Sequence, residues 1–166
     1  MKHYCAFETK GGWVALVGQD GKLQRSTLPK KTREEALAAV EAGLLTDAVE
    51  GHSAFGDLPS RLTRYFAGEQ VDFSDVEIDV SAQGPFHATV QRVAQKIPYG
   101  HLVTYRDLAR MAGNERAARA AGAAMAKNDV PIIVPCHRVV ASGSLGGFAL
   151  GPEWKRTLLH LEGVDI

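Results

Sequence analysis

The residues with the clearest chemical potential are Cys136, His137 and Arg138, which follow one another inside the apolar segment 128–140. A thiolate is a nucleophile, and cationic neighbours lower the pKa of a thiol. The order of residues therefore predicts a reactive thiol, against the alternative of an inert buried cysteine. In an extended strand Cys136 and His137 would point to opposite faces, so an interaction between them requires a local turn or a bridging water.

Two predicted helices joined by a short turn precede this segment. Thr104 and Asp107 have the spacing of a capping box, which predicts a helix that continues to Met111. After a turn that contains glycine, Asn114 is a good cap for a second helix over residues 115–127. A helix, a short turn and a second helix form the helix-turn-helix pattern.

The second of these helices has very small side chains. Seven of the ten residues 117–126 are alanine. Such a surface suits close packing in a core, or close approach to the backbone of a nucleic-acid duplex. Arg116 and Arg119 lie near the start of the helix, where their charges could meet phosphate groups, and they favour the second interpretation.

The first half of the chain predicts a small α/β unit that carries no reactive cluster. Its expected elements are strands at residues 3–8, 13–17 and 23–28, a helix over residues 33–42, and a second helix from about residue 59 to residue 68. Residues 69–84 are rich in acidic side chains and predict an extended connection, so we place the boundary near residue 84. Apolar residues at helical spacing then predict a helix over residues 86–97.

Composition excludes several classes of protein. The chain has 166 residues, 45% of them hydrophobic and 23% charged, which argues against disorder and coiled coil. No apolar run is long enough to span a membrane, and Cys5 and Cys136 are too few for a disulfide framework, so we expect a cytoplasmic protein. Residues 1–80 have four more acidic than basic side chains and residues 81–166 four more basic than acidic, so an anionic partner would prefer the second half.

The second half resembles the O6-alkylguanine-DNA alkyltransferases, also called methylated-DNA-protein-cysteine methyltransferases. The sequence Pro-Cys-His-Arg-Val-Val at residues 135–140 reproduces the active-site motif of that family. The resemblance covers roughly residues 84–163 and includes residues 97–100, 104–105, 113–114, 118–120, 128 and 159–163. The first 80 residues resemble the variable N-terminal domain of the family only loosely, through residues 12–13 and 65–69.

The resemblance implies an α+β protein of two domains. Residues 1–84 would form a small α/β domain that is ribonuclease H-like, together with its linker. Residues 85–166 would form a mostly helical DNA-binding alkyltransferase domain with a winged helix-turn-helix-like motif.

The resemblance also assigns the chemistry. Cys136 would attack the alkyl carbon on O6 of guanine and keep the group as a thioether, so that the protein is consumed after one turnover. His137 would act as a base through a water, and Glu162 would orient the imidazole. Tyr105 would donate to the guanine as it leaves.

For DNA binding, the resemblance implies that the alanine-rich helix enters the minor groove and that the target base is flipped out of the stack. Arg119 would fill the space that the base leaves. Arg116 and Asn114 would contact the DNA backbone, and the small residues Ala118 and Ala120 would permit close approach.

The resemblance implies a guanine pocket in which the side chain of Asn128 ties the recognition helix to the active-site segment, and which Pro131 and Val139 line. The loop that follows supplies residues 148–150, namely Phe148, Ala149 and Leu150. The family usually has glycine where Leu150 stands, so we expect this side chain to narrow the alkyl pocket.

The partner implied is double-stranded DNA that contains O6-alkylguanine, with O4-alkylthymine as a second candidate lesion. We expect a monomer with no membrane association, no cofactor and no metal. His3 and Cys5 could form half of a zinc site, but residues 21–33 contain no cysteine or histidine to complete it.

Three alternatives stay open at this point. The first is an alkyltransferase-like protein that binds lesions without removing them, although such proteins lack the cysteine. The second is a cysteine hydrolase that uses Cys136 and His137 on a small substrate. The third is a helix-turn-helix regulator in which the thiol has no role.

Overall fold

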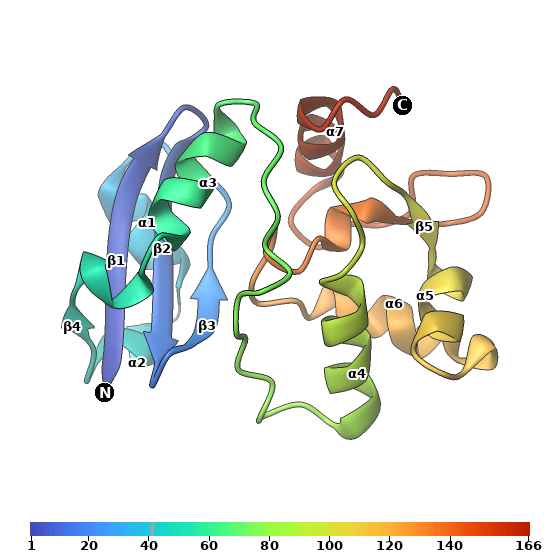
Figure 1. Cartoon of the computed structure of the whole chain (residues 1–166), viewed down its shortest axis with the longest axis horizontal. Helices are drawn as coiled ribbons and strands as arrows, with labels where there is room; N and C mark the ends of the chain where they lie inside the picture. The colour runs from blue at the N-terminus through green and yellow to red at the C-terminus, as the bar shows by residue number, and fades with distance from the viewer. Residues whose placement is uncertain (41) are drawn as a thin grey trace. The chain divides into compact units, whose positions relative to one another are not determined.

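The computed structural model of the chain describes residues 1–40 and 42–166, which form two compact units (Figure 1). The N-terminal unit comprises residues 1–71 and 75–79, and the C-terminal unit comprises residues 72–74 and 80–166. The chain thus changes unit a few residues before residue 84. The predicted α+β class is confirmed. None of the helices in the described part is long and apolar enough to cross a membrane.

The N-terminal unit is built on a four-stranded sheet in the order β3-β2-β1-β4. The strands β1 (Lys2–Thr9), β2 (Gly12–Gln19) and β3 (Lys22–Ser26) form an antiparallel meander, as predicted. Asp20 and Gly21 both have positive φ, 52° and 82°, which suits a two-residue hairpin turn. The strand β4 (Val49–Glu50), which is parallel to β1, was not predicted because two residues give no periodicity.

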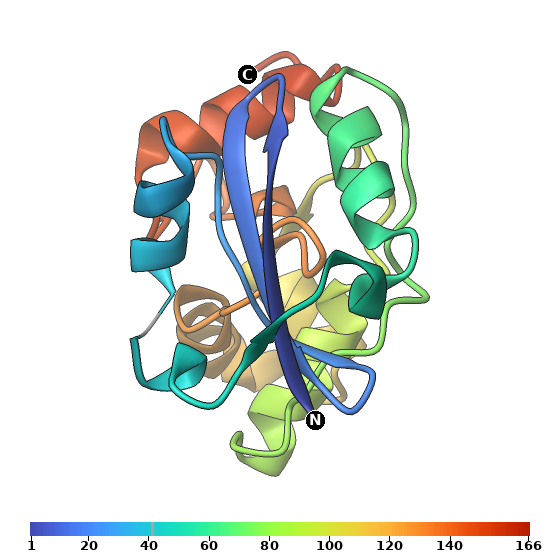
Figure 2. The ribbon, with the colours of Figure 1, turned by 90° about the vertical axis from the view of Figure 1, so that its left-hand side faces the viewer.

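Helices cover both faces of this sheet. The helices are α1 (Arg33–Ala39), α2 (Ala42–Leu45), the 3₁₀ turn η1 (His52–Phe55) and α3 (Leu58–Phe66). Figure 2 shows α1 and α3 on opposite faces of the sheet, so β2 buries five consecutive residues, 14–18. The predicted helix over residues 33–42 ends at Ala39 because Val40 is extended, and position 41 lies outside the described residues.

The C-terminal unit is mostly helical. Its elements are α4 (Pro85–Ala94), β5 (Val103–Thr104), α5 (Tyr105–Met111), the 3₁₀ turns η2 (Glu115–Ala117) and η3 (Cys136–Arg138), α6 (Ala118–Ala126), β6 (Val139–Val140) and α7 (Pro152–Leu161). The capping box of Thr104 and Asp107 is present, and α5 and α6 form the predicted helix-turn-helix. Two predicted helices are shorter than expected: residues 95–97 form a turn after α4, and residues 115–117 are 3₁₀ rather than α.

The packing of this unit brings the start of α5 beside η3. The strands β5 and β6 pair in parallel, with Val103 opposite Val139, so Tyr105 follows one strand where Cys136 shortly precedes the other. The core between α5 and α6 contains Leu108 and Ala121, which are fully buried. Small residues on α6 thus serve close helix packing on one side and leave the other side open.

Candidate active site

Cys136 begins the 3₁₀ turn η3 and not an extended strand. The N–H of Arg138 donates to the carbonyl of Pro135 at 2.9 Å, which closes the turn. Before it, Ile132 adopts a φ of 76°, a conformation that β-branched residues disfavour, and the chain reverses there. Of the two conditions that the sequence left open for a Cys136–His137 interaction, the local turn is present.

His137 is held by Glu162, the residue that follows α7. The Nε2 of His137 lies 2.6 Å from Oε2 of Glu162, and both side chains are completely buried. A carboxylate accepts, so Nε2 carries the proton and Nδ1 keeps its lone pair. That Nδ1 is buried and has no hydrogen-bond partner among the described residues. The imidazole is therefore oriented to accept a proton on the side away from Glu162.

Glu162 receives four hydrogen bonds, which keep it ionised. Besides His137, Arg138 donates from Nε to Oε1 at 2.8 Å and from Nη2 to Oε2 at 3.0 Å, and the N–H of Gly100 donates to Oε1 at 3.0 Å. Burial alone would raise the pKa of this carboxyl, but the hydrogen bonds from His137 and Arg138 hold it well below its ordinary value.

The thiol itself is buried, with Cys136 only 5% exposed. Burial raises the pKa of Cys136 to about 11, although a hydrogen bond from Asn128 and the charge of Lys155 act in the opposite direction. A backbone hydrogen bond from His137 also lowers the pKa of the thiol, but the charges of His137 and Arg138 do not, so the net shift is opposite to the expectation. Both cationic candidates are turned toward Glu162, and burial dominates.

Asn128 connects the end of α6 to the nucleophile. Its Nδ2 donates to the carbonyl of Val134 at 2.9 Å and to Sγ of Cys136 at 3.1 Å, while its Oδ1 accepts from the N–H of Val130 at 3.1 Å. One amide group thus fixes the segment between α6 and η3 and contacts the sulfur.

The thiol lines a cavity of about 360 Å³. This volume lies within the range of roughly 300–1,000 Å³ that small-ligand pockets have. The other lining residues come from α5, from α6 and from the loop after β6; they are Tyr105, Gly122, Met125, Ala126, Gly147, Phe148 and Ala149. A nucleophile, a phenol and an aromatic ring therefore share one cavity that is mostly apolar.

Tyr105 is placed to act as a donor in this cavity. Its hydroxyl donates to the carbonyl of Gly147 at 3.3 Å. Burial and the nearby Cys136 raise the pKa of the phenol, so it keeps its proton at neutral pH. Gly146 has a φ of 76°, and a Cβ there would come within 3.1 Å of the Tyr105 ring, so this loop requires glycine.

The remaining predicted pocket residues are divided by their positions. Phe148 and Ala149 line the cavity, as expected. Pro131 and Val139 are buried but are not among the residues that line it in the described part of the chain, which corrects the expectation that they do. Leu150 is 43% exposed and is not one of the residues that line the cavity in the described part of the chain. The N–H of Gly151 donates to the carbonyl of Phe148, and this turn carries Leu150 outward. The expectation that Leu150 narrows the alkyl pocket is corrected accordingly.

Lys155 is a site residue that the sequence reasoning missed. Its side chain is fully buried, and its Nζ donates to the carbonyls of Val139 at 2.6 Å and Gly147 at 3.0 Å. Burial lowers the pKa of Lys155 to about 8, against the influence of the Cys136 thiolate. The available signal was a lysine on the apolar face of α7, three and four residues before the buried Leu158 and Leu159.

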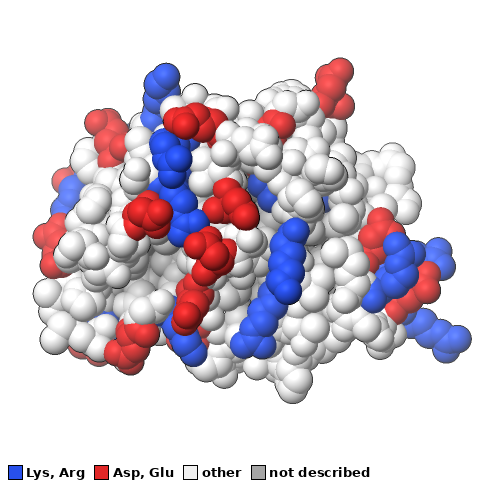
Figure 3. Space-filling model, viewed as in Figure 1, with Lys and Arg blue, Asp and Glu red and all other residues white. Residues whose placement is uncertain are grey.

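The predicted DNA-binding residues lie on the helix-turn-helix. Arg116 and Arg119 are exposed, and their guanidinium groups make no hydrogen bond or ion pair within residues 1–40 and 42–166. The side chain of Asn114 accepts from the backbone N–H of Arg116 at 3.2 Å. Ala118 and Ala120 are half-buried. Figure 3 shows basic and acidic side chains gathered together over α5. Two surface ion pairs account for this mixture: Arg106 with Glu115 and Arg110 with Asp107.

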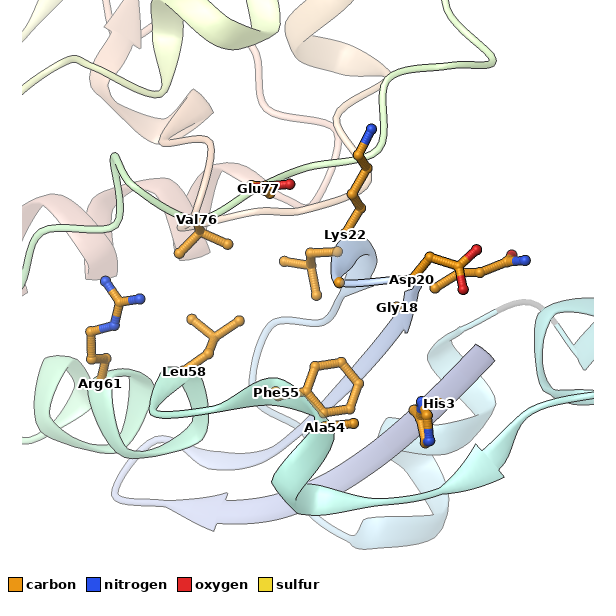
Figure 4. Close-up of a pocket in the computed structure, with 13 residues that line it drawn as sticks. His3, Gly18, Asp20, Lys22, Ala54, Phe55, Leu58, Arg61, Val76 and Glu77 are labelled. Atoms are coloured by element: carbon orange, nitrogen blue, oxygen red, sulfur yellow. The ribbon is translucent and has the colours of Figure 1, made fainter. Parts of the chain in front are cut away.

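A second cavity, of about 230 Å³, lies within the N-terminal unit (Figure 4). Phe55 and Leu58 form part of its apolar wall, and its Arg61 is engaged with Asp57 and Asp75. Its described lining contains no cysteine, serine or threonine. Among the residues described, no three or more His, Cys, Asp or Glu side chains gather in a way that could hold a metal ion. The C-terminal cavity is therefore the stronger candidate for covalent chemistry.

Comparison with known proteins agrees with this choice. A family model described as the DNA-binding domain of 6-O-methylguanine DNA methyltransferase matches residues 85–164. A methylated-DNA–protein-cysteine methyltransferase of Methanopyrus kandleri is 47% identical over 118 residues, which cover 71% of this chain and 88% of that protein. Its counterpart in Metallosphaera sedula is 34% identical over 163 residues, 98% of this chain and 94% of that protein.

Solved structures give the same result at the level of the fold. The crystal structure of Mycobacterium tuberculosis OGT in complex with DNA is 34% identical, with a TM-score of 0.77, over 96% of this chain and 92% of that chain. The O6-methylguanine-DNA methyltransferase of Pyrococcus kodakaraensis is 27% identical, with a TM-score of 0.70, over 99% of this chain and the whole of that one. The chain therefore belongs to the O6-methylguanine-DNA methyltransferase family of DNA-repair proteins.

Proposed function

We propose that Cys136 is the single-use acceptor of a methyl or other alkyl group from O6 of guanine in duplex DNA. The observation that carries this proposal is the buried Nδ1 of His137, which has no hydrogen-bond partner in the described part of the chain and belongs to the residue that follows a cavity-lining thiol. Because Nε2 of His137 is fixed by Glu162, Nδ1 is free to accept a proton as a general base.

In the transfer step, Sγ of Cys136 forms a bond to the alkyl carbon, and the bond from that carbon to O6 breaks. The thiol proton passes to Nδ1 of His137 through a bridging water, and Glu162 stabilises the imidazolium that forms. Asn128 donates to the sulfur and holds it in place. The product is a thioether, which has no leaving group, so the protein reacts once.

The electron pair of the broken bond goes to the base, which leaves as an anion. Tyr105 lines the same cavity as Cys136 and keeps its proton at neutral pH, so its phenol can donate to that anion. The developing negative charge lies in a mostly apolar site, where a single donor has a large effect.

DNA recognition is proposed to use α6 in the minor groove, with the target base flipped into the cavity. A buried thiol cannot reach a base inside the stack, which supports flipping. Arg119 fills the space that the base leaves, Arg116 and Asn114 contact the backbone, and Ala118 and Ala120 allow close approach. The related OGT of Mycobacterium tuberculosis has been crystallised in complex with DNA, which supports a duplex as the partner.

We also propose pocket residues, domain bounds, a location and a second lesion for this protein. We propose that Phe148 and Ala149 contact the bound guanine from the wall of the cavity, and that Asn128, Pro131 and Val139 support this pocket from outside its lining. We assign residues 85–166 as the DNA-binding alkyltransferase domain and residues 1–84 as the N-terminal domain and linker. We further propose a cytoplasmic monomer that needs no cofactor and for which O4-alkylthymine is a second candidate lesion.

A protection experiment tests the function. The protein is treated with iodoacetamide alone, after incubation with a duplex that contains O6-methylguanine, and after incubation with the unmodified duplex, and the peptide that carries Cys136 is quantified by mass spectrometry. We expect lasting protection by the methylated duplex only. Protection without a methyl group on the peptide would instead indicate a lesion-binding protein, and no protection would indicate a hydrolase or a regulator.

A further inference from the structure

Arg138 binds both oxygens of Glu162, and we infer that it keeps the Cys136–His137 pair uncharged at rest and so preserves a thiol that can be used only once. The inference rests on the proposed function and deepens it. Arg138 contacts neither the sulfur nor the cavity, so it is a positioning residue that acts through Glu162 and His137.

The side chain of Arg138 is held by three hydrogen bonds and a ring contact. It is 5% exposed and donates from Nε and Nη2 to the two oxygens of Glu162, at 2.8 and 3.0 Å. Its Nη1 donates to the carbonyl of Ile97 at 2.5 Å, and its guanidinium lies 5.8 Å from the centre of the Tyr99 ring. Such a bidentate pair is geometrically specific, and a lysine can replace its charge but not its fork.

The negative charge of Glu162 is balanced by Arg138 without a charge on His137. Glu162 is a buried carboxylate and needs a cation beside it. If Arg138 were absent, His137 at 2.6 Å would be the nearest group able to supply one, and its imidazolium form would be favoured. With Arg138 in place, protonation of His137 adds an uncompensated charge to a buried site, so the neutral imidazole is favoured.

The groups that face His137 act in line with this argument. Burial lowers the pKa of His137, Glu162 raises it, and the charges of Arg138 and Lys155 lower it, with a net shift downward. Glu162 and Lys155 come from α7 and its end, and Cys136 and Arg138 come from η3. Tyr99 faces Arg138 and Glu162, and its phenol remains protonated because burial raises its pKa.

The consequence for Cys136 follows from the balance of protons in the pair. A thiol can give its proton to a neighbouring imidazole at rest only if the imidazolium is stable there, and a thiolate formed in this way reacts with any electrophile. The charge that lowers the pKa of Cys136 directly is that of Lys155 and not that of Arg138. Loss of the Arg138 charge should therefore stabilise the imidazolium and thiolate together.

The test compares three variants: Arg138→Met, Arg138→Lys and the double variant Arg138→Met with Glu162→Gln. The rate of iodoacetamide reaction at Cys136 is measured as a function of pH, resolved by peptide so that Cys5 does not contribute. Removal of one nearby charge shifts a buried ionisation by about one pH unit or more, so Arg138→Met should react at least about tenfold faster than wild type near pH 7. Arg138→Lys and the double variant should react at the wild-type rate.

Two results would overturn the inference: a folded Arg138→Met protein that reacts no faster than wild type, or a double variant as reactive as Arg138→Met alone. If Arg138→Met does not fold, nitrogen NMR of His137 in the wild-type protein decides, because an imidazolium at neutral pH contradicts the inference and the neutral Nε2–H tautomer agrees with it. Methyl transfer from O6-methylguanine DNA is measured in parallel. Its absence would contradict the proposed function and leave the thiol result unaffected.

Discussion

The Cys136 thiol lines a cavity, yet it is 5% exposed and burial raises its pKa to about 11. Such a thiol reacts slowly with electrophiles in solution. Its reaction with a bound base must then depend on groups that remove its proton and stabilise the departing base. We propose that His137 removes the proton and that Tyr105 stabilises the departing base, because Nδ1 of His137 is unpaired among the described residues and Tyr105 lines the cavity.

Replacement of Tyr105 by phenylalanine tests whether its hydroxyl stabilises the departing base. The ring remains to line the cavity, but the hydroxyl donor is lost, and the loss of one such donor typically slows a reaction by about 100-fold or more. We expect the rate of methyl transfer to fall by about this factor while affinity for an unmodified duplex is unchanged. Single-turnover kinetics and binding measured on the same protein check this, and an equal loss in both would argue for a binding role.

Leu150 gives a prediction that reverses the expectation from sequence. Because this side chain is 43% exposed and lies outside the lining of the cavity, Leu150→Gly should change the rates with O6-methylguanine and O6-benzylguanine by the same factor. Phe148→Ala enlarges the cavity and should raise the rate with O6-benzylguanine relative to that with O6-methylguanine. A selective gain for the benzyl substrate in Leu150→Gly would show that the loop moves when the base enters.

At the scale of single residues, the sequence identified most of the site and missed two features. The motif at residues 135–140 marked Cys136 and His137 because of their order, and the structure adds their geometry. Lys155 was missed because it lies far along the chain from the motif and reaches it only by folding. The pKa of the thiol could not be deduced from neighbours in sequence, because burial is a property of the fold.

At the scale of elements, capping chemistry predicted boundaries better than apolar spacing did. The Thr104–Asp107 capping box places the start of α5 correctly, since its hydrogen bonds are local. The predicted helix over residues 86–97 ends at Ala94, because the N–H groups of Lys96 and Ile97 donate to carbonyls three residues earlier and close a turn. The strands β4, β5 and β6 have two residues each and exist only through their partners, so periodicity could not reveal them.

The capping box also gives a stability prediction. Thr104→Ala removes the acceptor of the Asp107 N–H at 3.0 Å and should destabilise the protein by about 1 kcal/mol. Urea unfolding followed by the fluorescence of Trp154, in a Trp13→Phe background, reports on the C-terminal unit. Thr157→Ala is a matched control, because that exposed hydroxyl donates only within α7 and should have little effect. Equal losses in the two variants would contradict the role of the cap.

For the molecule as a whole, the net charge of the chain cannot account for DNA binding, because it is zero. The chain has 19 basic and 19 acidic side chains, and two arginines of the helix-turn-helix, Arg106 and Arg110, are paired with acidic neighbours. Within the helix-turn-helix, Arg116 and Arg119 are the described arginines whose guanidinium groups make no ion pair, so duplex affinity should be most sensitive to them.

Replacing each of these two arginines by alanine should impair a different step: duplex binding for Arg116 and methyl transfer from DNA for Arg119. Arg116→Ala removes a proposed phosphate contact and should weaken duplex binding uniformly, with the slope of log affinity against log salt reduced by about 1. Arg119→Ala removes the residue proposed to replace the flipped base, so it should slow methyl transfer from DNA by at least about tenfold and leave the reaction with free O6-benzylguanine unchanged. Similar losses with free base and duplex in Arg119→Ala would contradict this separation.

The central claim is that Cys136 takes an alkyl group from guanine and keeps it. The most direct measurement is intact mass followed by peptide mapping after the protein is mixed with an equimolar duplex that contains one O6-methylguanine. We expect a gain of one CH₂ on the peptide that carries Cys136, saturating at one per protein and absent in Cys136→Ala. An unmodified Cys136 in a protein that binds the same duplex tightly would contradict it.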